Sequence, residues 1–391
     1  MSELSKRIGL SLPAMCGREM EYIKQAFEIN WIAPLGPNVD AFEDEICAYT
    51  GAKYALAMTT CTAAIHMALK YAGVGSGDVV FCSSLTFAAS CNPIIYQNAT
   101  PVFIDSEPES WNMSPAALQK AFEKYPNPKA VIVVNLYGQS ADMDKIIDIC
   151  NKHNAPVIED AAESLGATYK GRASGTIGKY GVFSFNGNKI ITTSGGGMLL
   201  CPDAEARKKI LKWITQSRDD AKHYEHSELG YNYRMSNICA GIGRGQLSAL
   251  EGQLKRRKKE IYETYKQAFA DIETIEMMPI CDYGEPNYWL SCLTLKEREG
   301  LKEREGKEGC KVSPADIMEA LEAENIESRP IWKPMHLQPY YKGYDYFTHY
   351  SDGDVSADIF RRGLCLPSGA NTDNMNDDDI KRIIEIVRGC F

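Results

Sequence analysis

The chain has 391 residues, with 43 Lys and Arg against 52 Asp and Glu and a formal net charge of −9. This acidic balance argues against a role on nucleic acid or on a membrane surface, although a small anionic ligand needs only local donors. The length exceeds the size at which one hydrophobic core usually divides, so we expect two domains. The larger should cover residues 13–250 and the smaller residues 251–391, after a polar lead-in of residues 1–12.

The cysteine content and the hydropathy of the chain indicate the compartment in which the protein works. The 13 cysteines are an odd number and show no metal-ligand spacing, so we expect free thiols, a reducing compartment and no metal site. The first residues lack the apolar core of a signal peptide, and no stretch reaches the ~18 apolar residues of a membrane span. Together these features predict a cytoplasmic protein.

The first helix is predicted over residues 18–30, where apolar side chains recur at helical spacing. A loop follows from Trp31 to Pro37, because two prolines and a glycine interrupt that pattern. Asn38 is a predicted cap for the next helix. Trp31 is either part of a packed connector or a ligand contact, and the residues alone leave both interpretations open.

Short apolar segments then alternate with helical ones. The predicted strands cover residues 54–58, 79–82, 101–105, 130–135, 155–158 and 180–185, and the predicted helices between them cover residues 65–72, 115–125 and 143–154. This alternation is typical of a mainly parallel sheet with helices on both faces. Ligands of such sheets bind at the carboxyl ends of the strands, so polar residues there are candidates for function.

The turn from Thr59 to Ala63 leads from a strand into a helix and is built of small residues. Free backbone N–H groups and the positive end of the helix dipole make such a turn an anion site. We therefore expect Thr62 and Ala63 to donate backbone amides to a phosphate. The alternative is an ordinary turn with a threonine cap.

Asp160 and Lys189 each follow a predicted strand, so a carboxylate and an amine should face one pocket. This pair suits pyridoxal phosphate, which needs an amine for covalent attachment and a carboxylate opposite its ring nitrogen. The lysine must lose its proton to act, which desolvation or a cationic neighbour favours. Phe87 follows the strand at residues 79–82, and its ring is either part of the core or stacked on the cofactor.

Beyond residue 200, a helix over residues 205–214 precedes a polar loop with His223 and His226. Because no cysteine or third histidine completes a metal site, we interpret this segment as an exposed loop. Arg234 is a candidate for binding a carboxylate or phosphate, and a structural salt bridge is the equal alternative.

The predicted smaller domain follows a long helix over residues 237–270, whose basic run at 255–259 is interpreted as a solvated face. The remaining predicted elements are a strand at 288–295, helices at 314–324 and 377–389, and a doubled charged hexapeptide at 295–306. A fully charged repeat cannot bury a core face, so we expect it to form an exposed loop or a helix extension.

Several segments that lie apart in the sequence resemble the same protein family. Glu159–Gly166, Phe183–Phe185, Lys189 and Thr192–Gly197 together resemble the core of the DegT/StrS family of nucleotide-sugar aminotransferases. The resemblance implies a fold-type I, α/β enzyme with a mixed, mainly parallel sheet in its large domain and a smaller C-terminal α+β domain. It also implies a homodimer with shared active sites.

The same resemblance assigns roles around the cofactor. Lys189 would bond the cofactor covalently and Asp160 would hold its ring nitrogen, while Glu163 would lie near its 3-hydroxyl. Ser184 would bind the phosphate, and Phe87 would stack on the ring. The family pattern Ser-Gly-Thr-Ala corresponds to residues 60–63, where this chain has cysteine in place of glycine.

Other residues would act across the dimer or on the substrate. In the family, the asparagine of a Gly-Tyr-Asn-Tyr-Arg segment reaches the cofactor phosphate of the neighbouring subunit, a role that falls to Asn232. The loop from Trp31 and the segment 327–339 resemble substrate-binding segments. They make Trp31, Arg329, Trp332 and His336 candidate substrate residues, beside Arg234.

The expected activity is amino transfer from an amino acid, with glutamate favoured, to the 4-keto carbon of a UDP-linked 6-deoxy-N-acetyl sugar. A dTDP- or GDP-linked keto sugar is the alternative substrate. Relatives that carry histidine at the lysine position perform dehydration, and Lys189 argues against that reaction here. A regulatory protein that binds the cofactor without turnover is an alternative from another class.

Overall fold

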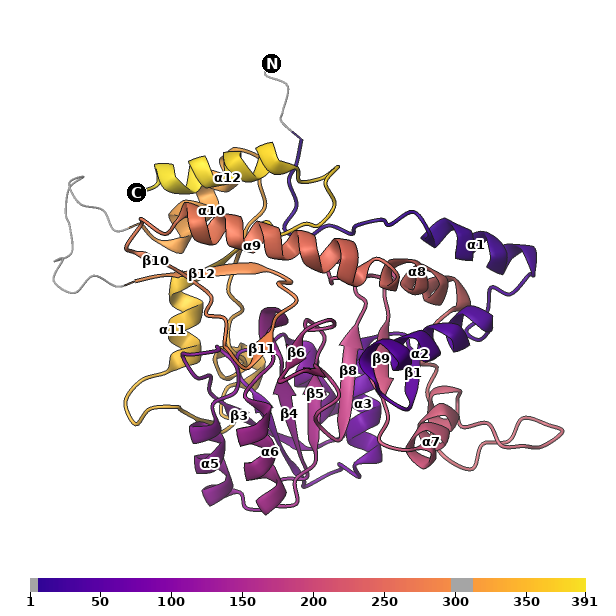
Figure 1. Ribbon diagram of the computed structural model, residues 1–391. Helices are drawn as coiled ribbons and strands as arrows, with labels where there is room; N and C mark the ends of the chain where they lie inside the picture. Colours follow the sequence, from indigo (N-terminus) through magenta and orange to yellow (C-terminus); the bar gives the residue numbers. More distant parts are fainter. Residues whose placement is uncertain (1–5, 297–311) are drawn as a thin grey trace.

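The computed structural model describes residues 6–296 and 312–391, and its two main parts each contain a sheet (Figure 1). The larger part carries an eight-stranded sheet, and the smaller part a four-stranded one. The predicted charged repeat lies, from residue 297 onward, outside the described residues.

The eight-stranded sheet is mixed and mainly parallel, as predicted. Its strands in spatial order are β1 (Ala55–Met58), β9 (Gly197–Leu200), β8 (Tyr180–Ser184), β5 (Val157–Asp160), β4 (Ala130–Val134), β2 (Val79–Ser83), β3 (Thr100–Ile104) and β14 (Tyr346–Phe347). The five neighbouring pairs from β8 to β14 are parallel, whereas β9 runs antiparallel to both β1 and β8. The sheet therefore confirms the α/β fold class.

Alternate residues of the central strands face opposite apolar layers. In β4, Ala130 and Ile132 pack in one cluster, and Val131 and Val133 pack in another. The first face is covered by α3 (Cys61–Tyr71), α4 (Asn92–Tyr96) and α7 (Ala204–Ile214), and the second by α5 (Pro115–Lys124) and α6 (Met143–Lys152). Because both faces are buried, the strands are nearly continuous apolar runs.

A third apolar cluster covers the β1–β9–β8 side of the sheet. It is formed with α2 (Pro37–Thr50) and α8 (Asn237–Leu247), and α1 (Glu19–Glu28) packs on α8. The prediction that Asn38 caps α2 is wrong, because Gly36 occupies the cap and Pro37 begins the helix. The Asn38 side chain instead accepts a hydrogen bond from Arg244 at 2.8 Å.

The smaller sheet is entirely antiparallel. Its order is β10 (Ile275–Met277), β12 (Ser291–Leu295), β15 (Gly363–Leu366) and β13 (Arg329–Pro330), and it packs with α9 (Arg256–Ala268), α10 (Pro314–Ala323), α11 (Val355–Arg362) and α12 (Asp377–Gly389). A third, three-stranded sheet joins β11 (Gly284–Glu285), β6 (Thr168–Tyr169) and β7 (Arg172–Ala173).

The N-terminal segment is more than a polar lead-in. Ile8 is buried in the core of the smaller part, and it forms a parallel bridge with Ile326. The sequence analysis did not predict this contact, because a single isoleucine among polar residues shows no periodic pattern.

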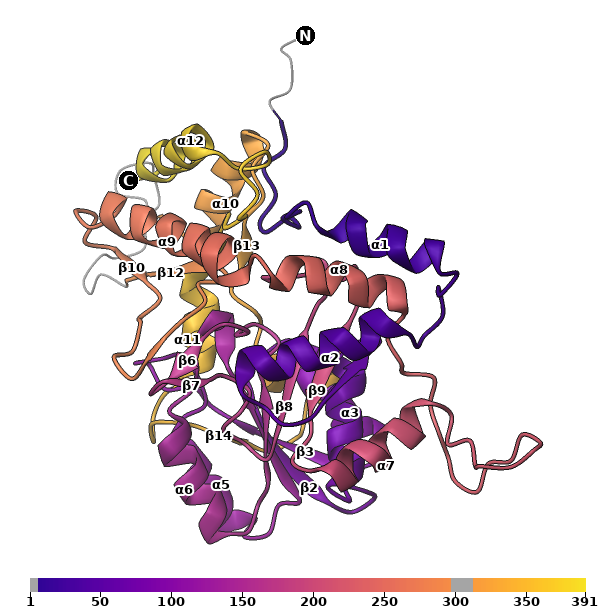
Figure 2. The same ribbon diagram turned by 45° about the vertical axis from the view of Figure 1, so that its right-hand side comes forward.

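The long helix predicted over residues 237–270 is interrupted. Its first segment, α8, ends at Leu247, a π-helical turn follows at Leu250–Lys255, and α9 continues from Arg256. Figures 1 and 2 show α8 and α9 end to end along the edge of the large sheet. The predicted domain boundary near residue 250 stays a prediction, because β14, which lies beyond it in sequence, pairs with β3 in the large sheet.

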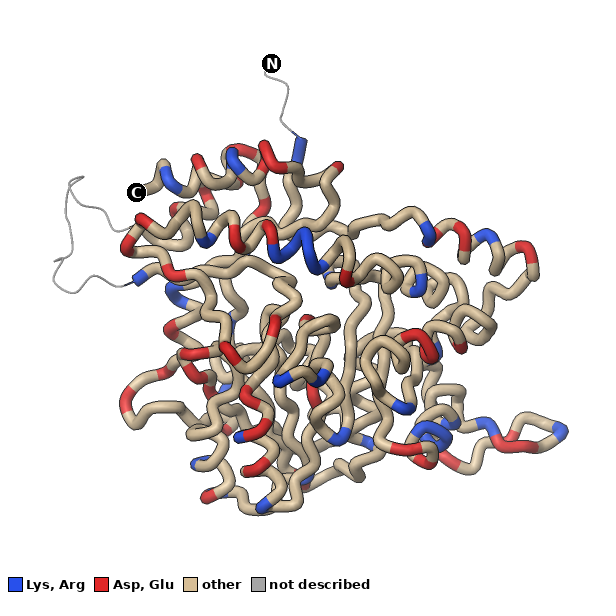
Figure 3. The backbone as a smooth tube through the Cα atoms, viewed as in Figure 1, with Lys and Arg blue, Asp and Glu red and all other residues tan. Residues whose placement is uncertain are grey.

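Surface charge is mixed over the described part of the chain. Acidic and basic positions alternate along the tube, and the basic run at the start of α9 is the densest blue segment in view (Figure 3). Among the described residues, no helix combines the length and apolar character that crossing a bilayer requires.

Candidate active site

The carboxyl ends of β5 and β8 meet beside the start of α3, and a cavity of about 330 Å³ opens there. Among its lining residues are Thr60, Cys61, Thr62, Phe87, Ser90, Asp160, Ser184, Lys189 and Trp332. The structure thus brings together six predicted site residues from five separate segments of the chain: Thr62, Phe87, Asp160, Ser184, Lys189 and Trp332.

Asp160 is the last residue of β5 and is buried at the base of this cavity. One carboxylate oxygen, Oδ2, accepts the Ser90 hydroxyl at 2.6 Å, and the other, Oδ1, accepts the Ala162 N–H at 3.1 Å. The Cys61 thiol lies 3.9 Å from Oδ1. Burial raises the pKa of Asp160, while these hydrogen bonds and the Lys189 charge oppose the rise.

Lys189 projects from the turn after β8, and its side chain is 11% exposed. Its Nζ lies 3.5 Å from Oε1 of Glu163, whose Oε2 accepts the Tyr137 N–H at 2.9 Å. Burial raises the pKa of Glu163 to about 7, and the Lys189 charge is the largest opposing influence. Glu163 therefore titrates near neutral pH beside the amine.

Two aromatic residues that the sequence analysis missed complete the surroundings of the amine. Nζ of Lys189 lies 4.0 Å from the ring centroid of Trp289, a distance typical of a cation–π contact. Tyr137 has φ +50°, and its hydroxyl accepts the Trp332 N–H at 3.1 Å. Tyr137 follows a strand, which is a usable signal, but Trp289 reaches the site from the smaller part of the protein.

The start of α3 supplies donors for an anion. The Thr60 hydroxyl accepts the Ala63 N–H at 3.0 Å and caps the helix, and the predicted bond from Ala63 to a phosphate stays a prediction. The N–H groups of Cys61 and Thr62 open the helix and have no intrahelical acceptor. Cys61 therefore joins Thr62 as a candidate phosphate donor, beside the Ser184 hydroxyl.

Gly197 allows this close approach of helix and sheet. A Cβ atom at Gly197 would lie 2.4 Å from the Cys61 nitrogen, which no side chain can tolerate. The cysteine at position 61, where the family pattern has glycine, is accommodated with its thiol turned toward Asp160. Gly197, the first residue of β9, therefore allows the start of α3 to lie close against that strand.

Phe87 does not belong to the core. Its side chain is 60% exposed and lines the cavity, with its ring centroid 5.8 Å from that of Trp332. An exposed ring at the mouth of a polar cavity is free to stack on a planar ligand. This placement favours the cofactor-facing interpretation over the core alternative.

Arg234 lies outside the residues that line the cavity. It forms the structural salt bridge that the sequence analysis gave as the alternative to a substrate contact. Its Nη1 is 2.5 Å from Oε1 of Glu43, and both side chains are almost fully buried. Glu43 also accepts the Ala57 N–H at 2.9 Å and pairs with Arg207 at 2.9 Å. The guanidinium is thus engaged in a buried ion pair, and its contact with the substrate stays a prediction.

His336 is likewise held by the fold. Its Nδ1 lies 2.7 Å from the Ser84 hydroxyl and its Nε2 lies 2.8 Å from Asp354, while its ring stacks on Tyr346 at 3.7 Å. Both ring nitrogens therefore have protein partners. These contacts fasten the segment that carries Trp332, and the substrate contact of His336 stays a prediction.

Three further candidates lie away from the cavity lining. Trp31 is 43% exposed, and its carbonyl accepts the Asn237 side-chain N–H at 2.9 Å. Arg329 is exposed and pairs with Glu327 at 2.6 Å. Asn232 is exposed beside its bridge partner Thr215, outside its own subunit's cavity, so its role across a dimer remains a prediction.

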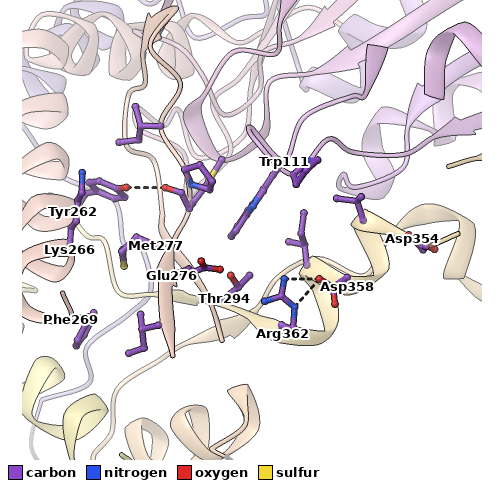
Figure 4. Close-up of a pocket in the computed structure, with 18 of the residues that line it drawn as sticks. Trp111, Tyr262, Lys266, Phe269, Glu276, Met277, Thr294, Asp354, Asp358 and Arg362 are labelled. Carbon is purple, nitrogen blue, oxygen red and sulfur yellow. Dashed lines mark hydrogen bonds and ion pairs between the residues drawn. The ribbon is translucent and has the colours of Figure 1, made fainter. Parts of the chain in front are cut away.

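A second and larger cavity, of about 790 Å³, lies between α9, β10 and α11 (Figure 4). Trp111, Tyr262 and Phe269 give it an apolar wall, and Arg362 pairs with Asp358 at 2.6 Å along its rim. None of the predicted site residues lines this cavity.

The polar loop that carries His223 is exposed, and His223 pairs with Glu225 at 3.2 Å. Within residues 6–296 and 312–391, no group of three or more His, Cys, Asp or Glu side chains is arranged to hold a metal ion. All cysteines in those ranges are free thiols.

The donor set around the 330 Å³ cavity fits pyridoxal phosphate. Lys189 supplies the amine, Asp160 the buried carboxylate, and Phe87 an exposed aromatic face. The start of α3 and Ser184 supply N–H and O–H donors for a phosphate. The chemistry of these groups thus matches the three recognisable parts of that cofactor.

Comparisons with known proteins agree with this geometry. The profile of the DegT/DnrJ/EryC1/StrS aminotransferase family matches residues 13–388. EpsN of Bacillus subtilis, which carries the name of a pyridoxal phosphate-dependent aminotransferase, is 50% identical over 99% of this chain and 97% of its own. GDP-perosamine synthase of Caulobacter vibrioides is 36% identical over 98% of each chain.

Among solved structures, Spr1654 of Streptococcus pneumoniae in its pyridoxal phosphate form has a TM-score of 0.86 at 25% identity. The likeness covers 98% of this chain and 100% of the other. That structure is named as a sugar aminotransferase, and its similarity extends over both parts of the fold described above.

The Arg234–Glu43 pair predicts a stability effect. Replacing Arg234→Met leaves a buried carboxylate with fewer partners, so the free energy of unfolding should fall by about 2–4 kcal/mol. The matched variant Arg207→Met removes the more exposed partner of Glu43 and should cost about 1 kcal/mol or less. Urea unfolding of the three proteins tests this. Equal losses in both variants would contradict the assignment of Arg234 to the core.

Glu163 predicts a pH dependence of stability. Its pKa is about 7 in the folded protein against 4.5 as the reference value, so the folded state binds more protons in that window. The contribution of Glu163 to the free energy of unfolding therefore falls as pH rises from about 4.5 to 7. Between pH 4.5 and 7, the free energy of unfolding of the cofactor-free wild type should fall by about 1–3 kcal/mol relative to that of Glu163→Gln. Parallel urea-unfolding curves at all pH values would refute this.

Proposed function

The chain belongs to the DegT/DnrJ/EryC1/StrS aminotransferase family, and from this premise we propose that it moves an amino group from L-glutamate to a UDP-linked sugar. The acceptor is the 4-keto carbon of a 6-deoxy-N-acetyl sugar. The observation that carries the proposal is the shared cavity of Lys189 and Asp160. An amine and a buried carboxylate at one sheet edge are what transamination with pyridoxal phosphate requires.

Bound pyridoxal phosphate supplies an electron sink for the carbanion that forms when the donor loses its α-proton. Lys189 would hold the cofactor through its amine, and the same amine would act as the general base at the donor's α-carbon. Trp289 and Glu163 keep the released amine within the cavity, at 4.0 and 3.5 Å from Nζ. In the return direction, the same amine delivers a proton to C4 of the sugar.

Asp160 holds a proton on the cofactor's ring nitrogen, which keeps that ring electron-withdrawing. Its burial in the cavity base strengthens this contact, because the local dielectric constant is low. Thr62, Cys61 and Ser184, which line the cavity, would bind the phosphate through backbone N–H and hydroxyl groups, and the Phe87 ring would pack on the cofactor face. Trp332 lines the open side, where the sugar enters.

The nucleotide assignment rests on three segments that resemble those of enzymes acting on UDP-linked sugars: residues 31–43, 215–228 and 329–339. A GDP- or dTDP-linked keto sugar is the second candidate. The 36% identity to a GDP-perosamine synthase favours GDP within that alternative. The product would feed synthesis of a surface polysaccharide or glycan in the cytoplasm.

A homodimer completes the proposed site. Large apolar side chains are exposed on α1 and the loop after it, including Met20, Phe27, Ile32 and Leu35. Such a patch is typical of a protein–protein contact. Asn232, exposed and outside its own cavity, would then reach the cofactor phosphate of the partner subunit.

The test offers the protein a panel of UDP-, GDP- and dTDP-linked 4-keto-6-deoxy sugars with glutamate as the amino donor. The rate of each reaction is measured from the release of 2-oxoglutarate. We expect kcat/KM for the UDP-linked N-acetyl sugar to exceed that for the others by at least about tenfold, which corresponds to ~1.4 kcal/mol of discrimination. Turnover of only GDP- or dTDP-linked sugars would overturn the nucleotide assignment. An absence of glutamate consumption that depends on any keto sugar would favour the regulatory alternative.

A further inference from the structure

The buried carboxylate of Asp160 must carry its negative charge to act on the ring nitrogen, and something must hold it in that state. We propose that Ser90 is the positioning residue that orients Asp160 and keeps it ionised, at the end of a hydrogen-bonded chain that starts at Thr86. This inference rests on the role proposed for Asp160 and extends it to residues that the sequence analysis did not assign.

The two hydroxyls form a directed chain. The Ser90 Oγ lies 2.6 Å from Oδ2 of Asp160, and the Thr86 Oγ1 lies 2.6 Å from the Ser90 Oγ. An ionised carboxylate only accepts hydrogen bonds, so the single Ser90 proton points to Asp160. The Ser90 oxygen must then accept the Thr86 proton. Successive bonds of this kind polarise one another and strengthen the final donor.

The backbone of one short turn sets this arrangement. The segment after β2 forms a 3₁₀ turn at Ala88–Ser90, in which the Ser90 N–H donates to the Phe87 carbonyl at 3.1 Å. Phe87 faces the open cavity, whereas Thr86 and Ser90 are 1% and 2% exposed. One turn therefore delivers an aromatic face to the ligand and a hydroxyl to the carboxylate.

The other groups around Asp160 cannot replace this hydroxyl. Oδ1 has the Ala162 N–H at 3.1 Å and the weaker donor Cys61 at 3.9 Å, whereas Ser90 is the recorded side-chain donor to Oδ2 within the described residues. The charged or titratable groups facing Asp160 are Lys189, Glu163, Cys61 and Cys82. Of these, Lys189 favours the ionised form through its charge, and the Cys61 thiol adds only a weak hydrogen bond in the same direction.

The electrostatic balance agrees with the geometry. Burial raises the pKa of Asp160, and the Ser90 hydrogen bond is the largest influence that lowers it. Removing the hydroxyl should therefore let Asp160 take up a proton at a higher pH. A neutral Asp160 cannot hold a proton on the ring nitrogen, so cofactor affinity and turnover should both fall at the acid end of the pH range.

The experiment compares holoenzymes of wild type, Ser90→Ala, Ser90→Thr and Thr86→Val. The acid limb of the kcat profile in Ser90→Ala should move up by about one pH unit, the size of shift that one lost hydrogen bond to a buried charge produces. In Ser90→Ala, the cofactor should also dissociate at least about fivefold faster than in wild type at pH 6. Absorbance of the protein during dialysis measures this rate. Ser90→Thr retains the hydroxyl and should restore both properties, and Thr86→Val should shift both in the same direction by less.

Ser164→Ala is the matched control. Ser164 is also fully buried, and its hydroxyl bonds to Ser174 at 2.7 Å rather than to Asp160. It should leave the acid limb and the cofactor dissociation rate unchanged, even if it lowers the melting temperature. Equal behaviour of Ser90→Ala and Ser164→Ala in the two pH-linked readouts would overturn the proposal.

Asp160→Asn separates failure of this inference from failure of the proposed function. If Asp160→Asn loses cofactor affinity and turnover while Ser90→Ala and Thr86→Val keep the wild-type acid limb, the Ser90 inference fails and the role of Asp160 stands. If Asp160→Asn retains wild-type affinity and turnover, the role proposed for Asp160 fails, and the Ser90 inference falls with it.

Discussion

The parallel pairing of β5 with β8 is the constraint on which the site depends. Asp160 stands opposite Val182 in that register, so a carboxylate ends one strand beside the strand whose exit turn carries Lys189. A slip of one residue would turn the carboxylate to the other face of the sheet. Ile158 and Val182 pack in one apolar layer while Val157 packs in the opposite layer, so the core itself fixes the register that the chemistry requires.

Burying charged groups at this edge is unfavourable unless each has partners. Asp160 is held by Ser90 and Ala162, and Glu163 by Tyr137 and Lys189, so the larger part of the fold provides most of the compensation. The smaller part adds the Trp289 and Trp332 rings beside the Lys189 amine. Contact between the two parts therefore shapes the surroundings of the lysine as well as stabilising the fold.

Local patterns predicted the sheet, its flanking helices, and the placement of Asp160 and Lys189, because these follow from strand ends and turn chemistry. For Phe87 the pattern left the core and the cavity open, and only the family resemblance favoured the cavity. Contacts between side chains far apart in the sequence could not be predicted from local patterns. Nothing near Arg234 in the sequence indicates a buried pair with Glu43, which lies 191 residues away. The clamp on His336 and the indole of Trp289 likewise depend on how distant segments pack. The Thr60 cap, by contrast, was visible in the sequence as the alternative to a free Ala63 amide.

The central claim is that Lys189 bonds pyridoxal phosphate. The direct measurement is borohydride reduction of the purified protein after incubation with the cofactor, followed by peptide mass mapping and a visible absorbance spectrum. The account predicts the reduced cofactor on Lys189, a visible band that glutamate bleaches, and loss of both in Lys189→Ala. Lys179→Ala, at the exposed opposite end of the same strand, should behave as wild type. Label on another lysine, or no visible band in the wild type, would contradict the account.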